Sequence, residues 1–262
     1  MLTTTTTTST TSTRAAPKPV KSKQPWTLEI RALYDDTSII VYQAYSEPIA
    51  TAAVTAQCLS ASPAFRPNRM TWIKPSWAWM MYRSFYSYKD PRQARILAIR
   101  MSRAGFHELL RHAILADNDI HNNDHADDQA GGYTSSSSSS SARKQADKTV
   151  RVQWDPERTP RLARVENVRS IQIGISGAWV GRWVDGMILA IEDVTPRARE
   201  LKATLDREPD LTDGELIERG LLPEERPYEL PGDIRAAVQR HRRGEATAKE
   251  EAKEEAKEDA NK

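Results

Sequence analysis

Six stretches of the chain have hydrophobic patterns typical of β-strands, and in three of them hydrophobic and polar residues alternate with a period of two, as in half-buried strands. In the first stretch, Leu28, Ile30 and Ala32 alternate with charged residues. Turn-forming residues at 35–38 separate it from the second, so the two are expected to pair as a hairpin. The predicted strands cover 28–32, 39–45, 96–101, 150–154, 171–175 and 187–194.

A second period, close to 3.6 residues, predicts helices between these strands. Ser46, Ser76 and Ser102 each precede such a stretch and are expected to cap its N-terminus. Pro196 stands in the first turn of the last predicted helix, where its fixed φ is favourable. The expected core-facing residues are Ile49, Ala53, Ala56 and Leu59 in the first helix and Phe106, Leu109, Leu110, Ala113 and Ile114 in a later one. Another predicted helix carries Trp179 and Trp183 one turn apart and ends at Gly186.

This order of elements favours a single α+β domain with a mixed, hairpin-containing sheet and packed helices. Hairpins and only partial alternation of strand and helix argue against a doubly wound parallel sheet. All seven tryptophans lie between Trp26 and Trp183, and we place the globular core at 26–202. A core of about 175 residues is long enough to exclude water without disulfide bridges.

Low-complexity sequence interrupts and flanks the predicted core. A basic, Thr/Ser-rich leader at 1–25 and a Lys/Glu/Ala tail at 244–262 are expected to be disordered or weakly helical. A Ser/Asp-rich insertion occupies about 117–147, and strand-like sequence resumes after it. Scattered apolar residues and four prolines indicate a peripheral appendage at 203–243.

Composition excludes several classes of protein. The formal net charge is +2, and Cys58 is the only cysteine, so no intrachain disulfide forms and a reducing compartment is favoured. No stretch approaches the 18 or so apolar residues of a membrane span, and we expect no membrane partner. We therefore expect a cytoplasmic or nuclear protein, with mitochondrial import of the basic leader as the alternative.

Familiar motifs for phosphate loops, dinucleotides, zinc and serine hydrolases are absent, so the cofactor is unknown and no metal site is predicted. His121 and His125 have helical ligand spacing, but they lie in the polar insertion. His107 and His112 are expected to be surface or structural histidines. Cys58 is interpreted as a packed apolar side chain.

The segment from Arg66 to Arg111 combines ten Arg/Lys and only two acids with six Trp and Tyr residues. Cations neutralise phosphate, and aromatic faces stack on bases. We expect Lys74 and Arg83, on either side of the Ser76 cap, to hold phosphate near a helix N-terminus that can itself bind an anion. Trp72 and Trp79 are candidates for base stacking. The alternative is that the aromatic side chains are core and the cations are simply solvated.

Polar residues at strand positions form a second candidate group. A sheet face bearing Arg31, Gln43, Gln153 and Gln172 could form the floor of a polar cleft, although alternation alone explains a solvated face equally well. Acidic residues on strands are candidates for a general base or an orienting acid, and these are Glu192 and Asp155.

Six separated motifs occur in order along the core. They are Ile30–Ala32, Val41–Tyr45, Arg69–Ser76, Trp79–Ser84, Val152–Arg158 and Ser170–Gly174. With these motifs the chain resembles the domain-of-unknown-function family numbered 4291, over about residues 26–202. The resemblance carries over no activity, cofactor or catalytic residue.

Two functional hypotheses follow. In the first, the protein is an enzyme acting on a phosphate-bearing nucleotide or nucleic-acid substrate in a basic, Trp-lined cleft. In the second, it is a non-catalytic binding module for RNA or an acidic partner. Turnover that depends on pH would favour the enzyme, whereas salt-sensitive binding without product would favour the module. The oligomeric state does not follow from the sequence.

Overall fold

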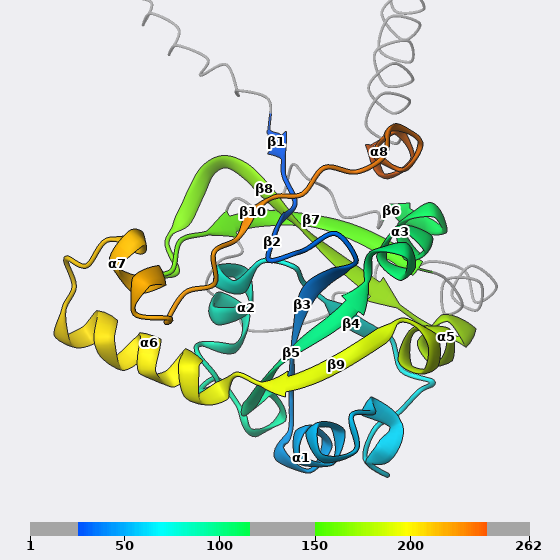
Figure 1. The fold of residues 1–262 in the computed structure, drawn as a ribbon, viewed down its shortest axis with the longest axis horizontal. Helices are drawn as coiled ribbons and strands as arrows, with labels where there is room; N and C mark the ends of the chain where they lie inside the picture. The colour runs from blue at the N-terminus through cyan, green and yellow to red at the C-terminus, as the bar shows by residue number, and fades with distance from the viewer. Residues whose placement is uncertain (1–25, 116–149, 240–262) are drawn as a thin grey trace, which may run out of the picture.

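The computed structural model of the protein describes residues 26–115 and 150–239 (Figure 1). The predicted leader at 1–25, insertion at 117–147 and tail at 244–262 lie outside these ranges, as do His121 and His125. The described residues form mixed sheets with packed helices, which confirms the α+β prediction. No helix among them is long and apolar enough to cross a membrane.

The largest sheet is built around two long strands, β7 and β8, which pair in antiparallel fashion (Figure 1). Short strands extend it on both sides: β6 pairs with β7, while β1 and β4 pair with different parts of β8. The order along the sheet is β1-β8-β7-β6, with β4 beside β8. The bounds are Thr27–Leu28 for β1, Thr71–Ile73 for β4, Ala113–Leu115 for β6, Val150–Arg158 for β7 and Arg164–Ile175 for β8.

A second sheet has the antiparallel order β3-β5-β9, and a two-stranded ribbon joins β2 to β10. One antiparallel bridge between Tyr42 of β3 and Lys74, just after β4, connects the second sheet to the first. The position of Lys74 is therefore fixed where the two sheets meet. The bounds are Arg31–Ala32 for β2, Ser38–Tyr45 for β3, Arg95–Ser102 for β5, Ile188–Asp193 for β9 and Arg226–Pro227 for β10.

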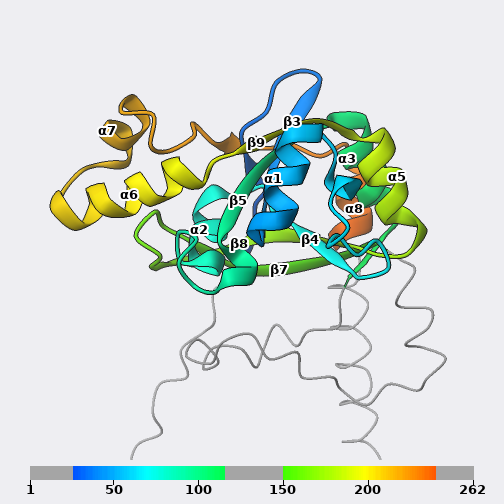
Figure 2. The ribbon, with the colours of Figure 1, turned by 90° about the horizontal axis from the view of Figure 1, so that it is seen from below.

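Two hydrophobic clusters hold these layers together. The larger contains the inner faces of both sheets and the buried sides of α1, α3, α5 and α8; the smaller lies on the opposite face of β3 and β5, against α2 and α6. Figure 2 shows β7 and β8 on one side of the molecule and β3, β5 and β9 on the other. The bounds are Glu47–Ala56 for α1, Trp77–Ser84 for α2, Arg103–Arg111 for α3, Ala178–Gly186 for α5, Thr195–Arg207 for α6, Asp213–Glu218 for α7 and Gly232–Gln239 for α8, with short 3-10 turns at Leu59–Ala61 and Pro91–Gln93.

Most locally encoded elements form as predicted. The side chain of Ser76 accepts the Trp79 N–H at 3.2 Å, and that of Ser102 accepts the Gly105 N–H at 3.1 Å, so both serines cap their helices. Ser46 occupies the N-cap position of α1 without a side-chain cap bond. Each cap bond joins residues only three apart in the chain, so a sequence pattern is enough to identify it.

Several local predictions are wrong; for example, Ala56 at the end of α1 is exposed and does not face the core. The stretch 28–32 is not one strand of a hairpin: β1 joins β8, and β2 joins β10, so its two ends belong to different sheets. The turn itself is present, because Tyr34 bridges Ile39. Ile114 does not face the core from a helix; α3 ends at Arg111, and Ile114 is 46% exposed on β6.

The core does not end at Lys202. Helix α6 continues to Arg207, and the segment predicted as a peripheral appendage buries apolar side chains in both clusters. The prolines shape the path of this segment without preventing its packing. Its buried residues are Leu205, Leu216, Leu222, Tyr228, Leu230, Ile234 and Val238.

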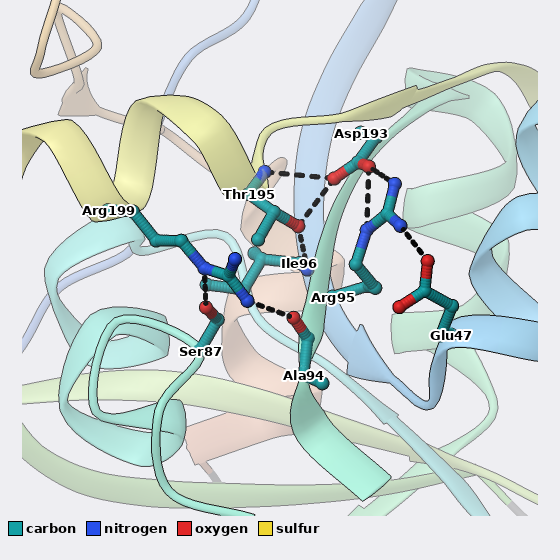
Figure 3. A network of polar contacts seen from close by, with 8 residues as sticks. All are labelled: Glu47, Ser87, Ala94, Arg95, Ile96, Asp193, Thr195 and Arg199. Atoms are coloured by element: carbon teal, nitrogen blue, oxygen red, sulfur yellow. Dashed lines mark hydrogen bonds and ion pairs between the residues drawn. The ribbon is translucent and has the colours of Figure 1, made fainter. Parts of the chain in front are cut away.

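A polar network fixes the point where β9 ends and α6 begins (Figure 3). Asp193 accepts the Thr195 N–H at 2.9 Å and Arg95 Nε at 2.9 Å, and Arg95 also reaches Glu47 at 2.8 Å. The Thr195 hydroxyl in turn accepts the Ile96 N–H at 2.8 Å. Four elements, α1, β5, β9 and α6, are thereby joined, which makes this network structural rather than a candidate site.

Candidate functional site

Polar side chains gather on the face of the large sheet that points away from the larger core cluster. On β7, Val152 and Trp154 face that cluster, so the alternating Gln153 and Asp155 point to the opposite side. Pairing places Gln153 opposite Gln172 and Trp72 opposite Gly174. We call the group on this side the polar face, and it comprises Trp72, Lys74, Gln153, Asp155 and Gln172.

Lys74 is the most restricted member of the polar face. Its backbone donates to Tyr42 O at 3.1 Å and accepts from Tyr42 N at 2.7 Å, and Pro75 follows it. Its side chain is only 5% exposed, and Nζ lies 4.5 Å from the centre of the Trp79 ring. The sequence predicts a phosphate-binding cation here, with a solvated cation as the alternative. The structure shows a buried amine because α2 folds back over the end of β4.

Burial changes the protonation of this amine. It lowers the pKa of Lys74 to about 7, with the negative charge of Asp155 opposing the shift and the positive charge of Arg83 adding to it. Burial likewise raises the pKa of Asp155, against the charge of Lys74 and the hydrogen bond from Gln153 at 2.9 Å. An amine and a carboxyl group that both titrate closer to neutrality can exchange protons with a bound substrate.

The polar face retains hydrogen-bonding capacity that the described residues do not use. Asp155 Oδ1 accepts from Gln153, but no described residue is bonded to Asp155 Oδ2. Buried polar atoms normally have a partner. An unused carboxylate oxygen near a buried amine is therefore consistent with a ligand site.

Trp72 is positioned by a glycine on the neighbouring strand. A Cβ atom on Gly174 would lie 2.9–3.0 Å from the Trp72 ring, so only glycine allows this close approach. The ring lies close to Gly174 of β8, and the residue is partly exposed. On α2, Arg83 is also partly exposed and donates to Gln93 Oε1 at 3.3 Å.

Five of the predicted site residues are not members of the polar face. Two of them lie beside it on α2: Arg83, and Trp79, whose buried ring covers Lys74 and so is not available to stack on a base.

The other three lie elsewhere in the fold. Arg31 lies in the β2–β10 ribbon and donates to Glu29 at 3.1 Å and Glu225 O at 3.0 Å. Gln43 lies on β3 and donates to the Thr71 hydroxyl in the interior. The predicted face of Arg31, Gln43, Gln153 and Gln172 is thus not formed, because only the last two belong to one sheet.

Glu192 is likewise separate. It is exposed on β9 opposite Ala98, with β5 and β3 between it and Lys74. Of the two predicted acids, Asp155 is therefore the one that the fold brings to the buried amine.

The N-terminus of α2 is not a free anion site. Glu225 Oε1 accepts the Trp77 N–H at 2.7 Å, and Glu157 accepts the Ser76 hydroxyl at 2.9 Å. Sequence reasoning missed this pair of acids. Glu225 is 148 residues from Trp77 in the chain, and only the tertiary fold brings it to the helix.

The charge of Glu225 is a testable property of this helix terminus. Burial raises its pKa well above the usual range; the Trp77 N–H opposes the shift, and the nearby Glu157 adds to it. Because the folded state binds this proton more tightly, its stability falls as pH rises above the unfolded pKa of about 4.3. We expect Glu225→Gln, which keeps the Oε1 acceptor, to stabilise the protein at pH 8 and to lose that advantage towards pH 4.

Urea unfolding at several pH values measures this difference, and Glu224→Gln at the exposed neighbouring position is the control. A Glu225→Gln variant less stable than the parent at pH 8 would instead mean that the ionised carboxylate is stabilised by Arg31 and Arg197.

The basic segment 66–111 does not form one continuous cationic surface. Several of its arginines turn to different parts of the molecule and bind acids there. Arg95 binds Asp193 and Glu47, and Arg100 binds Asp35 at 3.1 Å. Further along, Arg111 binds Asp233 at 3.3 Å. These pairings involve acids far away in the sequence, which the local charge count does not include.

The remaining candidate residues are structural. The Tyr228 hydroxyl lies 2.8 Å from His107 Nε2, and His112 Nδ1 donates to Glu108 O at 2.9 Å. Cys58 packs against the larger cluster. No group of three or more His, Cys, Asp or Glu side chains within 26–115 and 150–239 has a metal-binding arrangement.

A hollow of about 460 Å³ lies between α3 and α5, away from the polar face. None of the predicted site residues lines it; its walls are Glu108, Gly181, Arg182, Asp185, Gly186 and Met187. Glu108 and Arg182 form an ion pair at 2.5 Å across it. The chemistry of the buried amine is therefore a better guide to a site than this hollow.

Fold and polar face together define an α+β domain in which two sheets meet at a buried lysine. The chain belongs to the family described as Domain of unknown function (DUF4291), whose sequence model matches residues 29–228. The match extends beyond Lys202 to Tyr228, in agreement with the packing of the C-terminal segment. No curated protein matches the chain in sequence.

Proposed function

We propose that this protein is an enzyme that acts on a phosphate-bearing nucleotide or nucleic-acid substrate at the polar face. The observation that carries the proposal is the buried Lys74 amine, which lies beneath the Trp79 ring and is influenced electrostatically by Asp155. Burying a cation is unfavourable unless something compensates. A bound anion would provide that compensation.

The surroundings of Lys74 favour a nucleotide over a simple anion. Trp72 is held in a partly exposed position on β4, the strand that leads to Lys74, and a purine or pyrimidine ring can stack on such a surface. Arg83 supplies a second positive charge close enough to lower the pKa of Lys74. In the proposed complex, Lys74 and Arg83 bind phosphate, while Trp72 binds the base.

Asp155 is the proposed proton acceptor. Its Oδ2 atom has no hydrogen-bond partner among the described residues, and Gln153 holds Oδ1 in place. When phosphate binds and Lys74 becomes fully protonated, the Asp155 carboxylate can accept a proton from a substrate hydroxyl group or water. Gln172, opposite Gln153, is proposed to contact the substrate. We also propose a cytoplasmic or nuclear location, where such substrates are abundant.

Replacement of Lys74 tests the proposal. A thermal-shift screen of the full chain against ATP, AMP, NAD and pyrophosphate is expected to give a ligand, which at 100 times its Kd adds about 2.7 kcal/mol of stability. Lys74→Met keeps the length of the side chain and removes its charge, so it should abolish that shift. Arg182→Met, at an exposed arginine on α5, should retain it.

Binding should also depend on pH. Phosphate is attracted to the protonated amine, so affinity should fall as pH rises from about 7 towards 9, by up to about tenfold per unit. Lys74→Met should show no such dependence. If the Met variant binds every ligand as the parent does, the phosphate site lies elsewhere.

Turnover separates the enzyme from a binding module. The enzyme should convert its ligand to a product, and Asp155→Asn should prevent this while binding is retained. Binding without product in the parent protein, weakened uniformly by salt, would favour a non-catalytic module for RNA or an acidic partner.

A further inference from the structure

A left-handed turn follows α2 and leaves two aromatic rings exposed. Phe85, Tyr86 and Ser87 have φ angles of 47°, 53° and 80°. L-residues enter this region mainly one at a time, because Cβ then approaches the following carbonyl oxygen. Strained backbone of this kind persists where other contacts determine it, and it is concentrated at functional sites.

The surrounding contacts hold the turn in place. The buried Tyr86 donates its hydroxyl hydrogen to Pro160 O, and Ser87 N donates to Ser84 O at 3.1 Å. From α6, Arg199 Nε donates to the Ser87 hydroxyl at 2.8 Å (Figure 3). As a result, Phe85 is 47% exposed and Tyr88 is 56% exposed on a fixed backbone.

Each exposed ring is accompanied by a cation from α6. Lys202 Nζ lies 5.9 Å from the centre of the Phe85 ring, and the Arg199 guanidinium carbon lies 5.2 Å from that of Tyr88. These cations are at cation–π distance from the rings. A planar ligand with a negative charge could therefore contact a ring and a cation together.

The charge around the turn is positive. Segments 83–92 and 195–207 contain seven cationic residues and three acids. Some cations are paired with acids, as Lys202 is with Asp206 at 2.6 Å. Arg199, in contrast, donates to neutral acceptors, at the Ser87 hydroxyl and Ala94 O. Its charge is not cancelled by those hydrogen bonds.

Arg83 connects this region to the polar face. Its positive charge contributes to lowering the pKa of both Lys74 and Lys89, after the larger effect of burial on each. Arg83 therefore lies within electrostatic reach of both lysines. A polyanion could follow these cations along α2 from one region to the other.

We propose that the aromatic turn, comprising Phe85, Tyr88, Lys89, Arg199 and Lys202, binds single-stranded nucleic acid that continues from the polar face. The inference rests on the proposed function and specifies its substrate as an oligonucleotide rather than a mononucleotide. Bases stack on the two rings, and backbone phosphates lie against the three cations.

Two other occupants fit the turn less well. An acidic peptide would use the cations, but it would leave the two exposed rings without a planar partner. A membrane surface would accept aromatic rings and cations, but the rings lie on a turn rather than on an amphipathic helix. Single-stranded nucleic acid uses both the rings and the charges.

The test compares one oligonucleotide with one mononucleotide on the full chain. The probes are a fluorescein-labelled decauridylate, measured by anisotropy, and ATP, measured by calorimetry. We expect Phe85→Ala combined with Tyr88→Ala to weaken decauridylate binding about 10- to 100-fold and to leave ATP binding unchanged. Leu189→Ala, which shortens a side chain that is 56% exposed on β9, is the matched control and should change neither.

A charge variant provides an independent measurement that does not alter the turn. Lys89→Gln should make the slope of log K for decauridylate binding against log salt concentration shallower by about one, because one fewer counterion is released. The inference is overturned if the double aromatic variant binds decauridylate like the parent while Lys74→Met still loses ATP, and the proposed function then survives. If every variant binds both decauridylate and ATP as the parent does, the inference and the proposed function are both overturned. Preferential binding of polyglutamate or of anionic vesicles also overturns the inference.

Discussion

Replacing Trp77 by alanine is expected to destabilise the protein by about 3–5 kcal/mol. Trp77 is 1% exposed in the first turn of α2, and its ring meets Tyr42 edge to face with centroids 5.2 Å apart. The Arg197 guanidinium carbon lies 4.5 Å from the same ring. The substitution therefore leaves a cavity and uncovers a cation. Since domains of this size are stable by only about 5–15 kcal/mol, the loss is large.

Urea unfolding followed by far-UV circular dichroism measures this loss, because Trp fluorescence itself changes in the variant. Leu189→Ala at an exposed position should change stability by no more than about 0.5 kcal/mol. Trp77→Phe should lie between the two. A loss below about 1 kcal/mol for Trp77→Ala would mean that the ring does not help to hold α2 against β3.

A chain that ends at Lys202 is expected not to unfold cooperatively, whereas one that ends at Gln239 should. The shorter chain lacks seven buried apolar side chains, and truncating one such side chain typically costs about 2–5 kcal/mol. The summed loss exceeds the stability of an ordinary domain. It also removes the bond from Tyr228 N to Ile30 O at 2.7 Å and the Glu225 carboxylate at α2.

Circular dichroism during urea titration distinguishes the two chains. The dispersion of backbone amide signals in NMR spectra shows whether the shorter chain retains fixed side-chain packing. A milder variant, Ile234→Ala, tests the same packing in the full chain at a residue that is fully buried on α8. Cooperative unfolding of the shorter chain at the midpoint of the parent would contradict this account and restore the boundary that the sequence indicated.

The candidate site was only partly predictable from the sequence. The sequence identifies Lys74 and Trp72 through the basic, aromatic segment at 66–111, and Asp155 and Gln172 as polar residues at strand positions. Sequence gave no means of choosing between Asp155 and Glu192. The strand order decides it, since β7 lies in the sheet of β4, while β9 lies beyond β5.

The sequence by itself determined the elements whose signals are local. Ser76 and Ser102 cap their helices through hydrogen bonds three residues away, and the strands that become β7 and β8 follow from residue alternation. The tertiary structure alone decided which strands pair, how far the core extends and that Lys74 is buried. Those outcomes depend on contacts between residues far apart in the chain, such as Glu225 with Trp77, and no local pattern records such contacts.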